Sequence, residues 1–179
     1  MGNSTHHSLP PDTCSNGFSL IELIVILIIV GIISFFASSR FVNRTSFDEL
    51  GFFEESITAV RYAQKLAITS GCDVQVTINS SGYILEQWGN TATNECDFDD
   101  AGVSLSNVRK PGGGNFSGTA PSGVSITVAP NPTVWFFDQI GIPRTTGGVE
   151  ITMETTATIG SRTLSVAPHT GFTRCTTGC

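Results

Sequence analysis

The chain has 179 residues, with 9 basic and 15 acidic side chains and a formal net charge of −6. This acidic balance argues against a general nucleic-acid-binding domain, although it leaves room for a local basic patch. Roughly 140 residues follow an apolar N-terminal stretch, which is enough for one globular domain with its own core.

The apolar stretch runs from Phe18 to Ser39 and contains one charged residue, Glu22. A single membrane-spanning helix needs about 20 mostly apolar residues, so this stretch is long enough to be one. A carboxylate within such a helix is costly and normally has a partner or a function. We therefore expect the Glu22 carboxylate to have a partner or a function.

Three interpretations of the N-terminal region compete. A secretory signal peptide would have a shorter apolar core and a basic start, but Ala37-Ser38-Ser39 fits a small-residue cleavage site. A plain membrane anchor explains the length, but it explains neither Glu22 nor the Gly17–Phe18 junction. The third interpretation accounts for both features and rests on a motif.

The run Gly17-Phe18-Ser19-Leu20-Ile21-Glu22-Leu23 resembles the prepilin peptidase site of type IV pilin-like proteins. The resemblance implies a leader at residues 1–17, cleavage between Gly17 and Phe18, and N-methylation of Phe18. Residues 18–39 would remain as a transmembrane and filament-core helix. Glu22 would pair with the Phe18 amine of a neighbouring subunit and set the assembly register.

A helical pattern continues beyond Ser39. Residues that recur every three or four positions are expected to form one buried face of this helix. They are Leu50, Phe53, Ile57, Val60, Gln64, Ala67 and Ile68. The helix is expected to end at Ser70-Gly71, because a glycine is typical of a helix C-terminus. The sequence therefore predicts one helix of about 50 residues. Its second half would pack against a head formed by residues 40–179.

After Gly71 the pattern alternates, which indicates strands. Val74–Ile78 and Tyr83–Trp88 are expected to form a hairpin around Asn79-Ser80-Ser81-Gly82, and Lys110–Gly123 is expected to be a loop. Further strands are expected at Val124–Ala129, Thr133–Asp138, Val149–Thr155 and Thr163–Ala167. The predicted fold class is α+β, with the long N-terminal helix packed on one antiparallel sheet.

Two head segments carry a second resemblance. Trp135–Arg144 contains Phe137-Asp138-Gln139-Ile140-Gly141, and Leu164–Arg174 ends in Gly171-Phe172-Thr173-Arg174. Both are similar to segments of the pseudopilin H and FimT-like minor pilin group. The nearest subgroup suggested is a minor pilin of the mannose-sensitive haemagglutinin type.

Four cysteines follow the stem: Cys72, Cys96, Cys175 and Cys179. In a domain outside the cytoplasm they indicate two disulfides, for which three pairings exist. Closeness in sequence favours Cys72–Cys96 and Cys175–Cys179. No cysteine pair has the two-residue spacing of a zinc knuckle, so a zinc site is not expected.

No pattern predicts an enzyme, a cofactor or a metal site. Asp97, Asp99 and Asp100 resemble part of a calcium loop but are too compact for an EF-hand, so a solvated acidic turn is the simpler interpretation. Gly112-Gly113-Gly114 lacks the lysine of a phosphate loop, and His169 belongs to no triad pattern.

The resemblance implies a structural minor pilin or pseudopilin of the bacterial inner membrane, single-pass with a periplasmic head. Its partners would be prepilin peptidase and other pilin or pseudopilin subunits, in a type IV pilus or a type II secretion pseudopilus. The alternative is a DNA-binding minor pilin that uses arginines near the C terminus. The candidates for that role are Arg144, Arg162 and Arg174.

Overall fold

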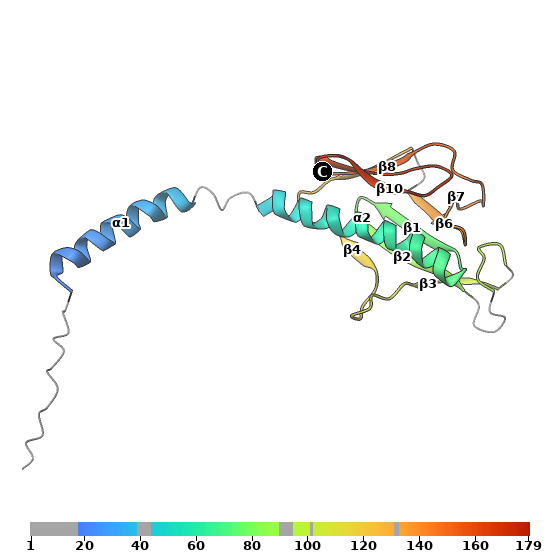
Figure 1. Cartoon of the computed structure of the whole chain (residues 1–179), viewed down its shortest axis with the longest axis horizontal. Coiled ribbons are helices and arrows are strands. Elements are labelled where there is room, and N and C mark those ends of the chain that lie inside the picture. The colour runs from blue at the N-terminus through green and yellow to red at the C-terminus, as the bar shows by residue number, and fades with distance from the viewer. Residues whose placement is uncertain (1–17, 39–43, 90–94, 101, 131–132) are drawn as a thin grey trace, which may run out of the picture. The chain divides into compact units, whose positions relative to one another are not determined.

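The computed structural model describes residues 18–38, 44–89, 95–100, 102–130 and 133–179. The chain forms two compact units, Met1–Val42 and Asn43–Cys179. Figure 1 shows the elements of both units along the chain. The predicted leader and the predicted helical join across residues 39–43 lie outside the described residues.

The described part of the first unit contains one helix, α1 (Leu20–Ser38), with Glu22 in its first turn. Its side chains from Leu20 to Phe35 are all exposed. Within the described residues, no helix meets both the length and the hydropathy required to cross a membrane.

The second unit begins with α2 (Arg44–Ser70), which has one buried face. Phe53, Ile57, Val60 and Ala67 are buried as predicted, whereas Leu50 and Ile68 are 36% and 51% exposed. The helix ends as predicted at Gly71, which adopts a φ of 65° and donates its N–H to the Ala67 carbonyl.

One antiparallel sheet has six strands in the order β3-β2-β1-β6-β7, with β4 also paired to β2. The strands are β1 (Val74–Asn79), β2 (Gly82–Gly89), β3 (Ser104–Asn107), β4 (Ser117–Thr119), β6 (Val134–Phe137) and β7 (Pro143–Thr145). The predicted β1–β2 hairpin is present, with Asn79 opposite Gly82 at its turn.

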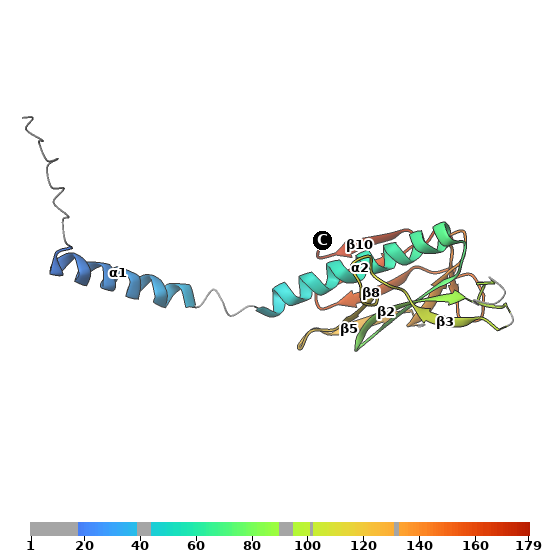
Figure 2. The same ribbon diagram turned by 90° about the horizontal axis from the view of Figure 1, so that it is seen from below.

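A second antiparallel sheet has four strands in the order β10-β9-β8-β5. They are β5 (Ile126–Ala129), β8 (Thr155–Ile159), β9 (Arg162–Val166) and β10 (Thr173–Thr177). Figure 2 shows α2 running along the head, with strands of both sheets beside it.

Both sheets contribute to one apolar core on the buried face of α2. Val74, Val76 and Trp135 come from the first sheet, and Ala157 and Leu164 come from the second. On α2, the small residues Ala59, Ala63 and Ala67 are at most 1% exposed. Because they recur every four residues, they leave space along one helix face for strands to approach closely.

The predicted α+β class, with a helix packed on antiparallel strands, is confirmed. The expectation of one sheet is wrong, because β5 and β8–β10 form a sheet of their own. The strand predicted at Val149–Thr155 is also wrong. Glu150 makes only an isolated bridge to Arg144, and β8 begins at Thr155.

The alternating pattern of residues 149–155 reflects a turn back along β7 and not a separate strand. Thr145 donates its N–H to the Val149 carbonyl and Ile151 donates to the Pro143 carbonyl, so the chain turns back along β7. The predicted Lys110–Gly123 loop in turn contains β4, a short strand of Ser, Gly and Thr that carries no apolar alternation.

Replacing Phe53 should test the shared core. Its side chain is 1% exposed, so Phe53→Ala should lower the free energy of unfolding by about 3–5 kcal/mol. Phe47→Ala on the same helix is the matched control, because Phe47 is 77% exposed and its loss should cost well under about 1 kcal/mol. Urea denaturation of the two full-length variants measures the difference, and equal losses would contradict this assignment of the core.

Candidate functional site

Ser19 caps the start of α1. Its Oγ accepts the Ile21 N–H at 3.3 Å, and its carbonyl oxygen accepts the Leu23 N–H at 3.1 Å. This cap places Glu22 in the first helical turn, where a carboxylate interacts favourably with the helix dipole. The Ser-x-x-Glu spacing of Ser19 and Glu22 is the sequence signal by which this helix start could have been predicted.

The predicted cleavage site lies immediately before this cap. Gly17 is outside the described residues, whereas Phe18 precedes the cap with 79% of its surface exposed. The predicted new terminus therefore lies next to a helix whose first turn already carries one negative charge.

The two head segments singled out in the sequence meet on α2. Gln64 Nε2 donates to the Gly141 carbonyl at 3.1 Å and to the Thr170 carbonyl at 2.7 Å. Gly141 belongs to the β6–β7 turn and Thr170 to the β9–β10 turn, so one side chain joins the two sheets. A Cβ at Gly171 would lie 2.4 Å from the Gly141 oxygen, so this contact requires glycine.

Asp138 forms the turn that carries Gly141. Its Oδ1 accepts the N–H groups of Ile140 and Ile142 at 3.1 and 2.8 Å, and its Oδ2 accepts Arg144 Nε at 2.7 Å. The Phe-Asp-x-x-Gly pattern therefore has a local structural role. Arg144 is held in the same turn and also donates to the Gly148 carbonyl.

An acidic cleft of about 490 Å³ opens next to this turn. Among its lining residues are Asp73, Asp97, Asp99, Asp138 and Arg144, with Phe98 and Phe136 as apolar walls. Asp73 is 4% exposed, and its Oδ2 accepts the Phe98 N–H at 3.0 Å. Burial, together with the nearby carboxylates, raises the pKa of Asp73 to about 6.

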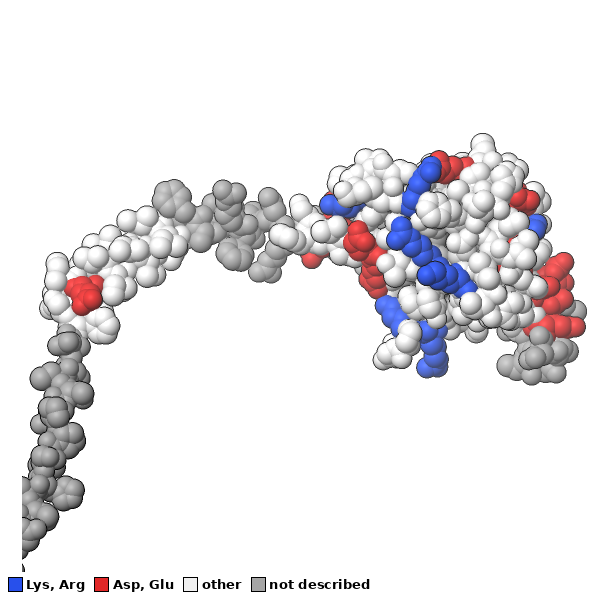
Figure 3. All heavy atoms as spheres, viewed as in Figure 1, with Lys and Arg blue, Asp and Glu red and all other residues white. Residues whose placement is uncertain are grey.

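The carboxylates of Asp97, Asp99 and Asp100 lie within 4.8 Å of one another. The Asp97 N–H donates to Asp100 Oδ2, which is a hydrogen bond within an acidic turn. Figure 3 shows acidic side chains gathered at this end of the head. Exposed acidic groups of this kind are common without a metal, so the cluster does not by itself indicate one.

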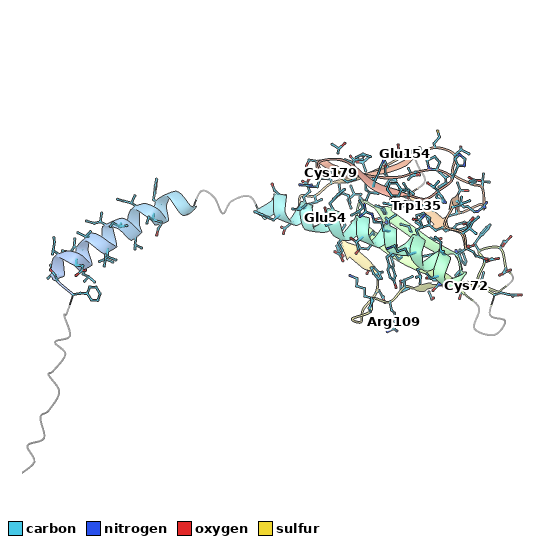
Figure 4. The ribbon with its side chains drawn as sticks, in the orientation of Figure 1. Glu54, Cys72, Arg109, Trp135, Glu154 and Cys179 are labelled. Carbon is cyan, nitrogen blue, oxygen red and sulfur yellow. A yellow bond between two sulfur atoms is a disulfide. The ribbon has the colours of Figure 1, made fainter. Side chains whose placement is uncertain are left out.

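The structure contains the two disulfides that closeness in sequence favours, Cys72–Cys96 and Cys175–Cys179. Figure 4 places Cys72 and Cys179 at opposite ends of the head. The first bond fixes the loop of Cys96 to the end of α2, and the second closes a small ring at the end of β10.

The three arginines proposed for the DNA-binding alternative are engaged within the head. Arg144 pairs with Asp138, Arg174 pairs with Glu154 at 2.9 Å, and Arg162 donates to the Gly178 carbonyl. Arg144 lies in the first sheet, whereas Arg162 and Arg174 lie in the second. Two of these positive charges are thus opposed by a carboxylate, which weakens a phosphate-binding role.

Comparison with known proteins addresses the N-terminal segment directly. The family model described as the prokaryotic N-terminal methylation motif matches residues 13–38. This match covers the Gly17–Phe18 junction, the Ser19 cap and Glu22. No curated protein matches the chain.

Solved structures similar to this chain include the type IV minor pilin FimU of Pseudomonas aeruginosa PAO1 in two crystal forms. One has 15% identity and a TM-score of 0.48, covering 74% of this chain and 90% of that chain. The other has 14% identity and a TM-score of 0.46, covering 71% and 91%.

The minor pseudopilin EpsH of the Vibrio cholerae type 2 secretion system is also similar. It has 15% identity and a TM-score of 0.43, covering 68% of this chain and 90% of that chain. At such identities and TM-scores, these likenesses do not decide the function.

The buried carboxyl of Asp73 predicts a pH-dependent stability. Its pKa is raised from 3.8 to about 6, so the folded state holds this proton more tightly than the unfolded chain does. The contribution to stability is complete below pH 3.8 and is lost as pH rises through about 6. Asp73→Asn, which keeps an acceptor for the Phe98 N–H, should therefore be more stable than wild type at pH 7 by roughly 1–3 kcal/mol.

The gap between the two proteins should close as pH falls to 4, as measured by urea denaturation at a series of pH values. Asp48→Asn on the exposed face of α2 is the control and should show no such pH-dependent gap. A gap for Asp73→Asn that stays constant from pH 4 to pH 7 would contradict the assignment.

Proposed function

We propose that this protein is a structural subunit of a type IV pilus or a type II secretion pseudopilus. Prepilin peptidase would cut between Gly17 and Phe18, and the new amino terminus at Phe18 would be methylated. The methylation motif across residues 13–38 is the observation that carries this proposal. The capped helix that follows and the α+β head are consistent with it.

The surface of α1 supports a role in lipid and then in a filament core. Its described side chains are exposed and almost all apolar, so they present a large hydrophobic surface. Exposed apolar surface of this extent calls for a membrane or for other proteins. We propose that the stem, residues 18–39, anchors the subunit in the inner membrane and later packs among other stems.

The two disulfides support a head outside the cytoplasm. Cys72–Cys96 and Cys175–Cys179 would be stable in the oxidising periplasm but not in a reducing cytosol. The apolar stem and the oxidised head together favour a single-pass protein with the head in the periplasm.

Glu22 has a specific part in assembly. The α-amino group created at Phe18 would be cationic near neutral pH and would pair with the Glu22 carboxylate of a neighbouring subunit. Inside an apolar filament core, this attraction offsets desolvation only in good geometry. The pair would therefore fix the register of neighbouring stems more than it strengthens their association.

We propose no enzymatic activity for this subunit, and no observation on the head favours nucleic acid as its ligand. The roles assigned are assembly, contact with sister subunits and interaction with prepilin peptidase. Extraction from the membrane would be driven by a separate protein.

Replacing Glu22 tests the assembly role. Glu22→Ala should still enter the membrane and be processed, but its share in sheared filaments should fall severalfold because the Phe18 amine loses its partner. Ser34→Ala is the control on the same helix, since the Ser34 hydroxyl donates to the Val30 carbonyl of its own helix. Immunoblots of the membrane and filament fractions measure both variants, and wild-type incorporation of Glu22→Ala would reject this role.

A further inference from the structure

The acidic cleft beside the β6–β7 turn is a cavity with a floor and walls. Its floor comes from the first sheet. Trp135 and Phe137 point into the shared core, so Phe136 between them projects from the opposite face of β6, where it is 1% exposed. Arg144 lies opposite Phe136 in the register of β6 and β7 and therefore shares this face. The cleft thus opens on the face of the first sheet that is turned away from the shared core.

The loop that follows Cys96 forms one wall of this cleft. The Cys72–Cys96 disulfide ties the loop to the end of α2, and the Phe98 N–H donates to Asp73 Oδ2 at 3.0 Å. The Phe98 ring also contacts the floor, because its centroid lies 4.7 Å from that of Phe136. A covalent bond, a hydrogen bond and a ring contact therefore hold this wall in place.

Asp73 supplies the cleft with a buried carboxylate that the head satisfies only in part. The residue lines the cleft and is 4% exposed. Its Oδ2 accepts the Phe98 N–H, whereas its Oδ1 has no hydrogen-bond donor among the described residues. Burying a carboxylate without a countercharge is costly, and the raised pKa of Asp73 reflects that cost. A cation in the cleft would lower the cost.

The charges of the cleft are not balanced within the described head. Arg144 is the one positive group among the described lining residues, and Asp138 already pairs with it at 2.7 Å. Asp73, Asp97 and Asp99 form no ion pair with any described residue. Three carboxylates therefore line the cavity without a positive charge opposite them.

A metal ion would use only part of this cleft. The carboxylates of the acidic turn, Asp97, Asp99 and Asp100, lie within 4.8 Å of one another, but Asp73 does not belong to this group. An ion bound at the turn would therefore leave the buried carboxylate without a countercharge. Calcium also takes about six to eight oxygen ligands in one shell, whereas two phenyl rings line this cavity.

A cation carried on an alkyl chain fits the whole cleft. Its methylene stem can lie against Phe98 and Phe136 while its charged end reaches Asp73. Gly148 leaves room for the Phe98 ring, because a Cβ at this position would lie 2.5 Å from the Cζ atom of the ring. The cavity of about 490 Å³ has the size of a small-ligand pocket, roughly 300–1,000 Å³. Arginine and lysine side chains have the required chemistry.

We propose that this cleft binds the charged end of an arginine or lysine side chain on a partner protein. Asp73, Asp97 and Asp99 would receive the positive charge, and Phe98 and Phe136 would contact the alkyl stem. The cleft by itself defines the ligand chemistry, whereas the choice of a partner subunit rests on the proposed function. The inference deepens that function by stating what a neighbouring subunit presents to this end of the head.

Saturation-transfer difference NMR on the full-length protein in detergent micelles tests the ligand chemistry. The probe is N-acetyl-arginine amide, and the matched control is N-acetyl-citrulline amide, which has nearly the same shape without the charge. At pH 7 the arginine probe should give a saturable signal that weakens severalfold with added salt, and the citrulline probe should give none. Equal signals from the two probes, or no signal from either, would overturn the proposal.

Calcium chloride tests the rival ligand. It should reduce the arginine signal no more than sodium chloride of the same ionic strength does. Complete displacement of the arginine probe by calcium, but not by sodium, would make the cleft a calcium site and would overturn the proposal.

Two cleft variants locate the binding. Asp73→Asn should weaken binding of the arginine probe severalfold, although it is expected to be more stable than wild type at pH 7, so poor folding cannot explain the loss. Asp97→Asn combined with Asp99→Asn should have the same effect. Asp48→Asn combined with Glu54→Gln removes two charges from exposed positions of α2 and should leave binding unchanged. Wild-type binding by both cleft variants would overturn the proposal.

Filament assembly tests the choice of partner. The variant with Asp97→Asn and Asp99→Asn should still be cleaved after Gly17, but its share in sheared filaments should fall severalfold. Wild-type incorporation of this variant would overturn the assignment to a partner subunit, while the proposed function would stand. If the unmodified chain is absent from filaments altogether, the proposed function fails, whereas the NMR result still decides the ligand chemistry of the cleft.

Discussion

The head depends on α2, because this one helix supplies the surface on which both sheets pack. Its buried face combines large side chains such as Phe53 with alanines at positions 59, 63 and 67, and strands of both sheets lie against it. Gln64 adds a polar link, since its amide joins one turn from each sheet.

At the start of α1, the residues that begin the helix also position the charged residue Glu22. Ser19 caps α1 and thereby places Glu22 where the helix dipole favours a carboxylate. A charge that is stabilised locally is less costly to keep in an apolar stem, and it stays available to a cationic partner. Cleavage after Gly17 would create such a partner one residue before the cap. The proposed assembly mechanism therefore requires no residue beyond those that already start the helix.

The sequence predicted those elements in which apolar residues recur at a regular spacing. Most of the α2 stripe, the β1–β2 hairpin and the helix end at Gly71 follow from the spacing of apolar residues and glycine, whereas Leu50 and Ile68 are exposed. It did not predict β3, β4, β7 or β10, because these short strands have no apolar alternation. Nor could it predict the division into two sheets, since that depends on pairings between distant segments such as β5 and β8.

The candidate site was predictable to a similar extent. The Gly17-Phe18 junction and Glu22 follow from a local motif, and both cysteine pairs follow from closeness in sequence. By contrast, the meeting of Gly141 and Thr170 on Gln64 joins residues from three distant parts of the chain. The engagement of Arg144 by Asp138 likewise depends on the shape of the β6–β7 turn, and the spacing of residues in the sequence does not reveal it.

The proposed function requires that the apolar stem is retained after a single cut and begins with a methylated amino terminus. Mass spectrometry of the N-terminal peptide, from protein purified out of its native host, tests this most directly. The expected chain begins with N-methylated Phe18. A chain that still begins at Met1, or one that begins downstream of residue 39, would contradict it.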